Sequence, residues 1–147
     1  CIKFNEEDDD ETSYRNRTSA LVYRLAETYL IAAEAIMRSS GDPLPYINAV
    51  RTRANAAPVT TVSEQIILDE RARELSFEGQ RWFTLKRMGQ DVINRQIRTY
   101  AGDGEFFPAN LGAKDPRTNW QDHFINWPIF QEDLDLLGPN YPQNDGY

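Results

Sequence analysis

The segment Glu70-Arg-Ala-Arg-Glu-Leu-Ser-Phe-Glu-Gly-Gln-Arg-Trp-Phe-Thr-Leu-Lys-Arg87 combines a regular series of acidic residues with several arginines. At helical spacing, Glu70, Glu74 and Glu78 fall four residues apart and form a column of like charges. Each such pair destabilises an isolated helix by about 0.2–0.5 kcal/mol, so we expect cations beside the column. The predicted structural ion-pair network consists of Glu70, Arg71, Arg73, Glu74, Glu78 and Arg81.

A column of carboxylates can also hold a metal ion or carry out acid–base catalysis. Helical di-metal sites use Glu-x-x-His motifs on facing helices, whereas the single histidine, His123, lies far along the chain in a region rich in proline and glycine. The sequence also has no Gly-x-Ser-x-Gly motif, no phosphate-binding glycine loop and no Cys/His cluster. The structural interpretation is therefore favoured, and we predict no catalytic residue, no metal site and no cofactor.

Helical periodicity on both sides of this segment predicts a mainly α fold. The predicted helices span about residues 19–39, 43–56, 63–79 and 81–98. Gly41 is the predicted residue that ends the first helix, Ser63 is the predicted N-cap of the third, and Gly89 is the predicted bend in the fourth. Within a single domain, residues 1–147, we expect residues 19–98 to form two antiparallel helical hairpins that resemble tetratricopeptide units.

Residues 99–147 form the second part of the predicted domain, an irregular C-terminal segment packed on the helices. From Tyr100 onward the chain contains nine of its seventeen aromatic residues and five of its eight prolines. Such a composition allows only short helices, and residues 132–137 are the best candidate. We expect residues 127–130 to be extended.

Two tryptophans of this segment could form a stacking surface for a sugar, or could be buried. Trp120 lies among Arg117, Asn119, Gln121 and Asp122, and we predict it as the ligand-binding residue, with burial as the competing interpretation. Trp127 is followed by Pro128 and Ile129, and we expect it to belong to the core. His123 has no second histidine or cysteine nearby and is predicted to be an ordinary polar residue.

The formal net charge of −7 argues against nucleic acid as a partner, because phosphate binding requires a basic surface. Residues 12–102 nevertheless contain thirteen lysines and arginines against nine acidic residues. The sequence has no apolar run of about 20 residues that could span a bilayer and no signal peptide. We interpret Cys1 as an internal cysteine, and expect any lipid anchor to lie on sequence not present here.

Several segments of the chain resemble the SusD/RagB family in the same order. The motif Glu-Arg-x-x-Glu-Leu-x-Phe-Glu-Gly-x-Arg-Trp-Phe-x-Leu-x-Arg of residues 70–87 is similar to the C-terminal signature of that family. Further similar segments are Arg24-Leu-Ala-Glu-Thr-Tyr-Leu-Ile-Ala-Ala-Glu-Ala35, Asn48-Ala-Val-Arg-Thr-Arg-Ala54, Pro128-Ile-Phe-Gln-Glu-Asp-Leu134 and Gln143-Asn-Asp-Gly-Tyr147. Phe130 and Asp145 replace prolines of the family pattern, and Asp133-Leu134 replaces Glu-Ile. Members are several hundred residues long, so the chain resembles their C-terminal part.

The resemblance implies a surface-exposed lipoprotein of the Bacteroidetes outer membrane that binds nutrients, most often oligosaccharides, without making or breaking bonds. It implies a SusC-like TonB-dependent transporter as the partner, with this chain as mainly a scaffold or docking part. The alternatives are a peptide-binding member of the same family and a glycan-cleaving enzyme. We expect the helical hairpins to offer a cationic docking face, with Arg38 and Arg51 outside the ion-pair network.

Overall fold

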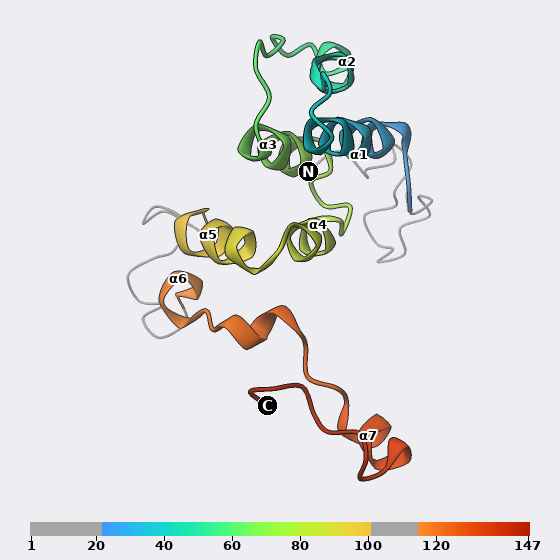
Figure 1. The fold of residues 1–147 in the computed structure, drawn as a ribbon, viewed down its shortest axis with the longest axis vertical. Helices are drawn as coiled ribbons and strands as arrows, with labels where there is room; N and C mark the ends of the chain where they lie inside the picture. Colours follow the sequence, from blue (N-terminus) through green and yellow to red (C-terminus); the bar gives the residue numbers. More distant parts are fainter. Residues whose placement is uncertain (1–21, 101–114) are drawn as a thin grey trace, which may run out of the picture. The chain divides into compact units, whose positions relative to one another are not determined.

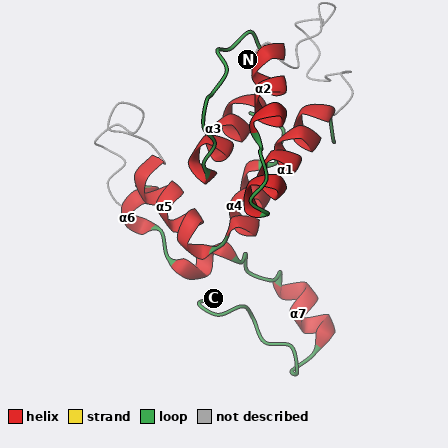
Figure 2. Ribbon diagram, turned by 45° about the horizontal axis from the view of Figure 1, so that its top comes forward, coloured by secondary structure: helices red, strands yellow, loops and turns green. Residues whose placement is uncertain are grey.

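The computed structural model describes residues 22–100 and 115–147, and it divides into two compact units, Cys1–Arg81 and Trp82–Tyr147 (Figure 1). In chain order the elements are α1 (Leu25–Arg38), α2 (Leu44–Arg53), α3 (Glu64–Glu74), α4 (Arg81–Met88), α5 (Gln90–Tyr100), α6 (Pro116–Asn119), the 3₁₀ helix η3 (Asp122–Ile125) and α7 (Gln131–Leu137). All regular structure in these two ranges is helical, as Figure 2 shows, which confirms the predicted mainly α class. The tetratricopeptide-like pairing stays a prediction.

The first unit is a three-helix arrangement in which α1 packs against both α2 and α3. On α1, Ala26, Leu30 and Ala33 recur at helical spacing and are all buried, so one stripe of the helix faces the core. The partner helices contribute two buried apolar residues each. These residues are Ile47 and Val50 on α2, and Ile67 and Leu68 on α3.

Helix α1 is shorter than predicted at its N-terminus and ends one residue earlier than Gly41 would imply. Residues 22–24 are not helical, and residues 19–21 lie outside the described residues. At the C-terminus Ser40, with φ of 63°, adopts the left-handed conformation predicted for Gly41. The Gly41 N–H donates to the Ile36 carbonyl (2.8 Å) and the Ser40 N–H to the Met37 carbonyl (3.3 Å), which is the Schellman pattern.

Gly41 is required for a different reason. A Cβ atom at this position would lie 2.7 Å from Cγ2 of Ile36, so the chain passes too close to that side chain for anything larger than glycine. Gly41 therefore permits close packing against Ile36, whereas Ser40 adopts the left-handed backbone conformation at a steric cost.

Helix α3 begins as predicted and ends early. The Ser63 hydroxyl accepts a hydrogen bond from the Ile66 N–H (3.3 Å), which confirms Ser63 as the N-cap. The helix ends at Glu74 instead of near Gly79, and the following turn contains two left-handed residues, Phe77 (φ 64°) and Gly79 (φ 75°). Glu78 therefore lies in this turn, and the expected helical column extends only from Glu70 to Glu74.

The second unit contains most of α4, all of α5 and the C-terminal segment. Gly89, with φ of 108°, separates α4 from α5, which confirms the predicted bend. Val92 and Ile93 of α5 are buried with Leu85 of α4. Helix α5 packs against α6 and η3 within this unit, and the packing of the whole C-terminal segment on the helical hairpins stays a prediction.

The rest of the C-terminal segment is less regular. Helix α7 confirms the predicted helix at 132–137, but none of its residues is buried. Residues 127–130 have no regular secondary structure. Residues 101–114, which include part of the predicted irregular segment, lie outside the described residues.

The end of α1 offers two neighbouring substitutions with opposite expected effects. Gly41→Ala should destabilise the chain by about 1–3 kcal/mol, because the new methyl group overpacks against Ile36. Ser40→Gly should stabilise it by up to about 1 kcal/mol, because glycine adopts a left-handed conformation without steric cost. Urea unfolding of the two variants beside the wild type measures both changes. A loss of stability in Ser40→Gly would contradict the assignment of the two positions.

Candidate functional site

Arg24 precedes α1 in an extended conformation and contacts two acids of the predicted column. Its Nε donates to both carboxylate oxygens of Glu78, at 2.9 and 2.8 Å. Its Nη1 donates to the Glu74 carboxylate and its Nη2 to the Glu74 backbone carbonyl. Hydrogen bonding to Glu78 raises the pKa of the Arg24 guanidinium above its usual value, although partial burial opposes the shift. One guanidinium therefore holds two carboxylates and the end of α3.

The remaining carboxylate contacts come from α2 and α3. Arg51 Nη1 lies 2.5 Å from Glu70 Oε2, and Arg73 Nη2 lies 3.0 Å from the same oxygen. Arg53 Nη2 lies 2.6 Å from Glu74 Oε1. The carboxylate side chains of the three acids are only 5–7% exposed. We call Arg24, Arg51, Arg53, Glu70, Arg73, Glu74 and Glu78 the arginine–glutamate cluster.

Sequence reasoning missed three of the four arginines in this cluster, because it looked only at neighbours along one helix. Arg51 was placed outside the network, and this was wrong. The available signal was that Arg24, Arg51 and Arg53 all lie in the other segments that carry the family resemblance. Arg38 was predicted, like Arg51, to lie outside the network. Its Nε lies 3.3 Å from Glu34 Oε1, and its Nη2 lies 3.9 Å from Glu64 Oε2.

The other two predicted members contact different parts of the first unit. Arg71 of α3 lies 3.6 Å from Glu27 of α1, and both side chains are nearly inaccessible to solvent. Arg81 donates from Nη1 to the Leu68 backbone carbonyl (2.8 Å). Burial lowers the pKa of Arg81, and the charge of Asp69 opposes this shift.

The geometry of the cluster suits structural support. Each carboxylate accepts a hydrogen bond from at least one guanidinium, as in a structural ion-pair network. Within residues 22–100 and 115–147, no three histidine, cysteine, aspartate or glutamate side chains gather closely enough to hold a metal ion.

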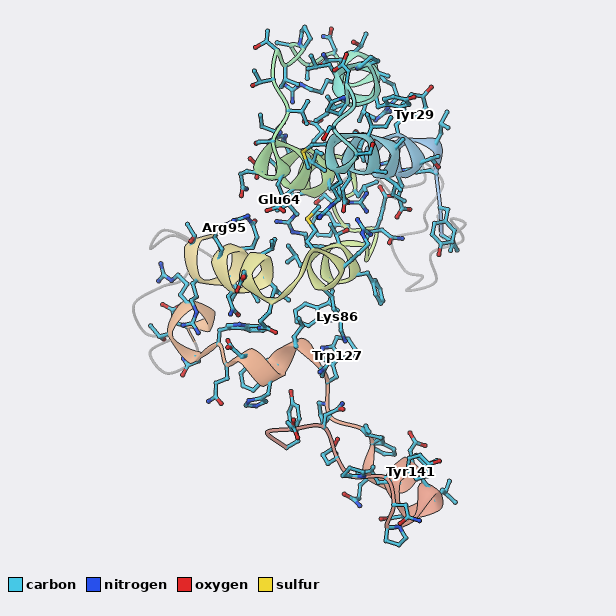
Figure 3. The ribbon with its side chains drawn as sticks, in the orientation of Figure 1. Tyr29, Glu64, Lys86, Arg95, Trp127 and Tyr141 are labelled. Carbon is cyan, nitrogen blue, oxygen red and sulfur yellow. The ribbon has the colours of Figure 1, made fainter. Side chains whose placement is uncertain are left out.

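A small hollow lies between α1 and α2 near Tyr29, which Figure 3 labels. Its volume is about 200 Å³, and it is lined by Leu25, Ala26, Tyr29, Ala49, Val50 and Arg53. Ligand pockets usually measure about 300–1,000 Å³. We therefore assign no ligand to it.

The second unit contains a group of rings in contact, which includes the predicted ligand-binding residue, Trp120. We call this group the aromatic cluster, and its members are Trp82, Trp120, His123, Phe124, Trp127 and Tyr147. The Trp120 ring meets Trp82 edge-on (centroids 6.0 Å apart, 71° between planes) and Phe124 in the same way (5.7 Å, 77°). Its Nε1–H donates to Asn94 Oδ1 on α5 (2.6 Å), and the ring is half-buried. Its internal contacts are those of a packed residue, and a role in ligand binding stays a prediction.

Trp127 is placed differently from what the sequence suggested. Its ring is stacked on Trp82 (6.2 Å, 29° between planes), yet the residue is 69% exposed (Figure 3). The expectation that Trp127 belongs to the core was wrong. The neighbouring Pro128 is also exposed, and only Ile129 is half-buried, so this short segment has no apolar layer to enter.

His123 contributes to the aromatic cluster through ring contacts. Its ring meets Phe124 (4.5 Å, 75°) and Tyr147 (5.0 Å, 90°) edge-on. The C-terminal residue of the chain is therefore fixed on η3.

Comparison with known proteins explains why the motifs occur together. The model of the SusD family matches residues 1–147, which is the whole chain. The chain belongs to the SusD family. It is 37% identical over 131 residues to the starch-binding protein SusD of Bacteroides thetaiotaomicron, a match that covers 88% of this chain and 22% of that relative. It is 36% identical over 93 residues to the SusD-like protein P2 of Formosa agariphila, covering 52% of this chain and 18% of that relative.

This SusD-family chain thus spans about a fifth of the length of the curated relatives that it matches. In the part of it that the structure describes, no helix is long and apolar enough to cross a membrane.

The arginine–glutamate cluster predicts unequal effects for two arginines that share Glu74. Arg24→Ala should destabilise the chain by about 2–4 kcal/mol, because it leaves two largely buried carboxylates short of a cation. This value lies between the roughly 0–1 kcal/mol of an exposed pair and the 3–5 kcal/mol of a buried one. Arg53→Ala should cost about 0–1 kcal/mol, because the Arg53 side chain is 63% exposed.

Chemical denaturation of both variants beside the wild type measures the difference. If the two variants lost equal stability, Arg24 would have no special position in the cluster.

Proposed function

We propose that this chain is mainly the scaffolding or docking part of a non-catalytic protein that binds glycans at the outer cell surface, and that it retains part of the glycan contact. The observation that carries this proposal is the match of the whole chain to the SusD family, together with 37% identity to a starch-binding relative. The first ligands to test are therefore α-glucans, the chemical class of starch.

The described residues support a scaffolding role for the first unit. Its polar interior is made of arginine–carboxylate pairs, and its apolar interior is made of small and branched aliphatic side chains. Neither set offers an exposed flat surface on which a sugar could stack. The aromatic cluster of the second unit offers the better surface for recognition.

We further propose that the protein acts beside a SusC-like TonB-dependent transporter. A lipid anchor on sequence not present here would hold it at the outer membrane. In this arrangement the protein captures the ligand and delivers it to the transporter, and no bond is made or broken. A peptide-binding role and glycan cleavage are the competing functions.

One experiment separates binding from cleavage. The chain is incubated with starch, other polysaccharides and a set of peptides, and both retention on the ligand and new reducing ends are measured. We expect retention on at least one glycan with no increase in reducing ends, because the described carboxylates of the cluster are held by arginines. The Bacteroides thetaiotaomicron relative serves as the positive control. Released sugar would show that the protein is a glycan-cleaving enzyme. Retention on peptides alone would show that the ligand is a peptide and not a glycan.

The docking role is tested at Arg38, because Arg51 belongs to the arginine–glutamate cluster. Arg38→Glu reverses a half-exposed charge at the end of α1 and should weaken co-purification with the transporter. Thr28→Glu, at an exposed position on the same helix, is the control and should leave recovery unchanged. Equal recovery of Arg38→Glu and wild type would remove this face from the interface.

A further inference from the structure

We propose that Trp127 forms the stacking surface for one sugar ring of a bound glycan, positioned by Trp82 and by the C-terminal residues Gln143 and Asn144. This inference rests on the glycan-binding function proposed above and names a site for it. It places the contact at Trp127 instead of Trp120.

Trp120 and Trp127 differ in how much of each side chain is available to a ligand. Trp120 is half-buried, and its indole N–H is already bonded to Asn94. Trp127 is stacked on Trp82 on one side and is 69% exposed, so its opposite face is open to solvent. A pyranose ring presents a face of C–H bonds, whose weakly positive hydrogens are attracted to the negative face of an aromatic ring. The open face of Trp127 matches this chemistry.

The backbone that carries Trp127 is fixed from two sides by amide side chains. The Ile129 N–H donates to Gln143 Oε1 (2.7 Å), and Gln143 Nε2 donates to the Ile129 carbonyl (2.8 Å). Asn144 Nδ2 donates to the Trp127 carbonyl (2.7 Å). Pro128, between the two anchored residues, has a fixed φ and restricts the residue before it. The exposed ring therefore stands on a preorganised backbone, which lowers the entropy cost of binding.

The last residues of the chain hold this arrangement in place. Gly146 has φ of 94°, and a Cβ atom there would lie 2.4 Å from Cγ of His123, so the chain passes directly against the imidazole. Tyr147 meets the same ring edge-on. We call residues 143–147 the C-terminal anchor, because they attach the end of the chain to η3 and to residues 127–129.

Two exposed polar residues lie near the stacked tryptophans, one along the chain and one on α4. Asn126 precedes Trp127 and is exposed. Lys86 is also exposed and lies four residues after Trp82 on α4, a spacing that places both residues on the same side of that helix. An amide and an ammonium group can hydrogen-bond to sugar hydroxyls at the edge of the stacked ring. A flat aromatic face with polar groups at its edge favours a neutral, hydroxylated ligand.

The test is a calorimetric titration of the chain with maltoheptaose, carried into the millimolar range. Trp127→Ala should weaken binding at least tenfold, which corresponds to about 1.4 kcal/mol. Phe130→Ala is the matched control, because Phe130 is 65% exposed in the same segment but has no ring stacked behind it among the described residues. Its affinity should equal that of the wild type.

A second variant keeps the test informative if Trp127→Ala fails to fold. Maltoheptaose should change the tryptophan fluorescence of the wild type. Trp127→Phe, which retains Trp82 and Trp120, should lose that change.

The positioning role of Gln143 is tested by a double-mutant cycle. Gln143→Ala should weaken maltoheptaose binding in the wild type and should cause no further loss in the Trp127→Ala background. A merely destabilising substitution would weaken both backgrounds equally, and that result would overturn the positioning role.

The outcomes separate this inference from the proposed function. If the wild type bound no glycan of the panel, the proposed function would fail and this inference with it. If the wild type bound maltoheptaose and Trp127→Ala bound equally well, only the inference would be overturned. Loss of transporter recovery in Trp127→Ala with unchanged maltoheptaose affinity would show that a polypeptide covers Trp127 instead, and would likewise overturn it.

Discussion

Arg24 joins the start of α1 to the end of α3 in the first unit. Its backbone is extended immediately before α1, and its guanidinium binds the Glu74 and Glu78 carboxylates and the Glu74 carbonyl. The last carbonyls of a helix have no partner within it, and a cation is favourable at that end of the helix dipole. Arg24 thus caps the C-terminus of α3 from the residue that precedes α1, and α3 ends at the residue whose carbonyl is bound.

The interior of the first unit consequently combines two kinds of contact with different geometric demands. Leu30, Ile47 and Ile67 exclude water but tolerate small shifts of one helix against another. The pair between Arg71 and Glu27 depends on distance, because the attraction between two buried charges weakens as they separate. Removing one partner of such a pair strands a buried charge, at a cost of about 3–5 kcal/mol. The apolar contacts supply the driving force for packing, and the ion pairs select one relative position of α1 and α3.

Features fixed by near neighbours in the chain were predictable from the sequence, and features fixed across the fold were not. Ser63 caps its own helix, and Gly89 breaks a helix locally, so both were recognised. At the early end of α3, Glu74 is bound by Arg24, which lies 50 residues away in the chain. Ser40, and not Gly41, has the left-handed conformation at the end of α1, and Gly41 is instead close to the Ile36 side chain. The spacing of residues in the sequence does not reveal this contact. The prediction that Trp127 is buried was wrong because its apolar neighbours Pro128 and Ile129 do not show whether another part of the fold covers the segment.

The two tryptophans that contact Trp82 are held in place in two different ways. The Trp120 ring is held through its own N–H by Asn94, so its polar atom is used inside the second unit. Trp127 is held through its backbone carbonyl by Asn144, so its position is fixed while its ring remains available. No residue of the arginine–glutamate cluster takes part in these described contacts. If Trp127 binds a sugar as proposed, stability and recognition draw on different side chains, and the ring stays exposed for binding without weakening the charged interior of the first unit.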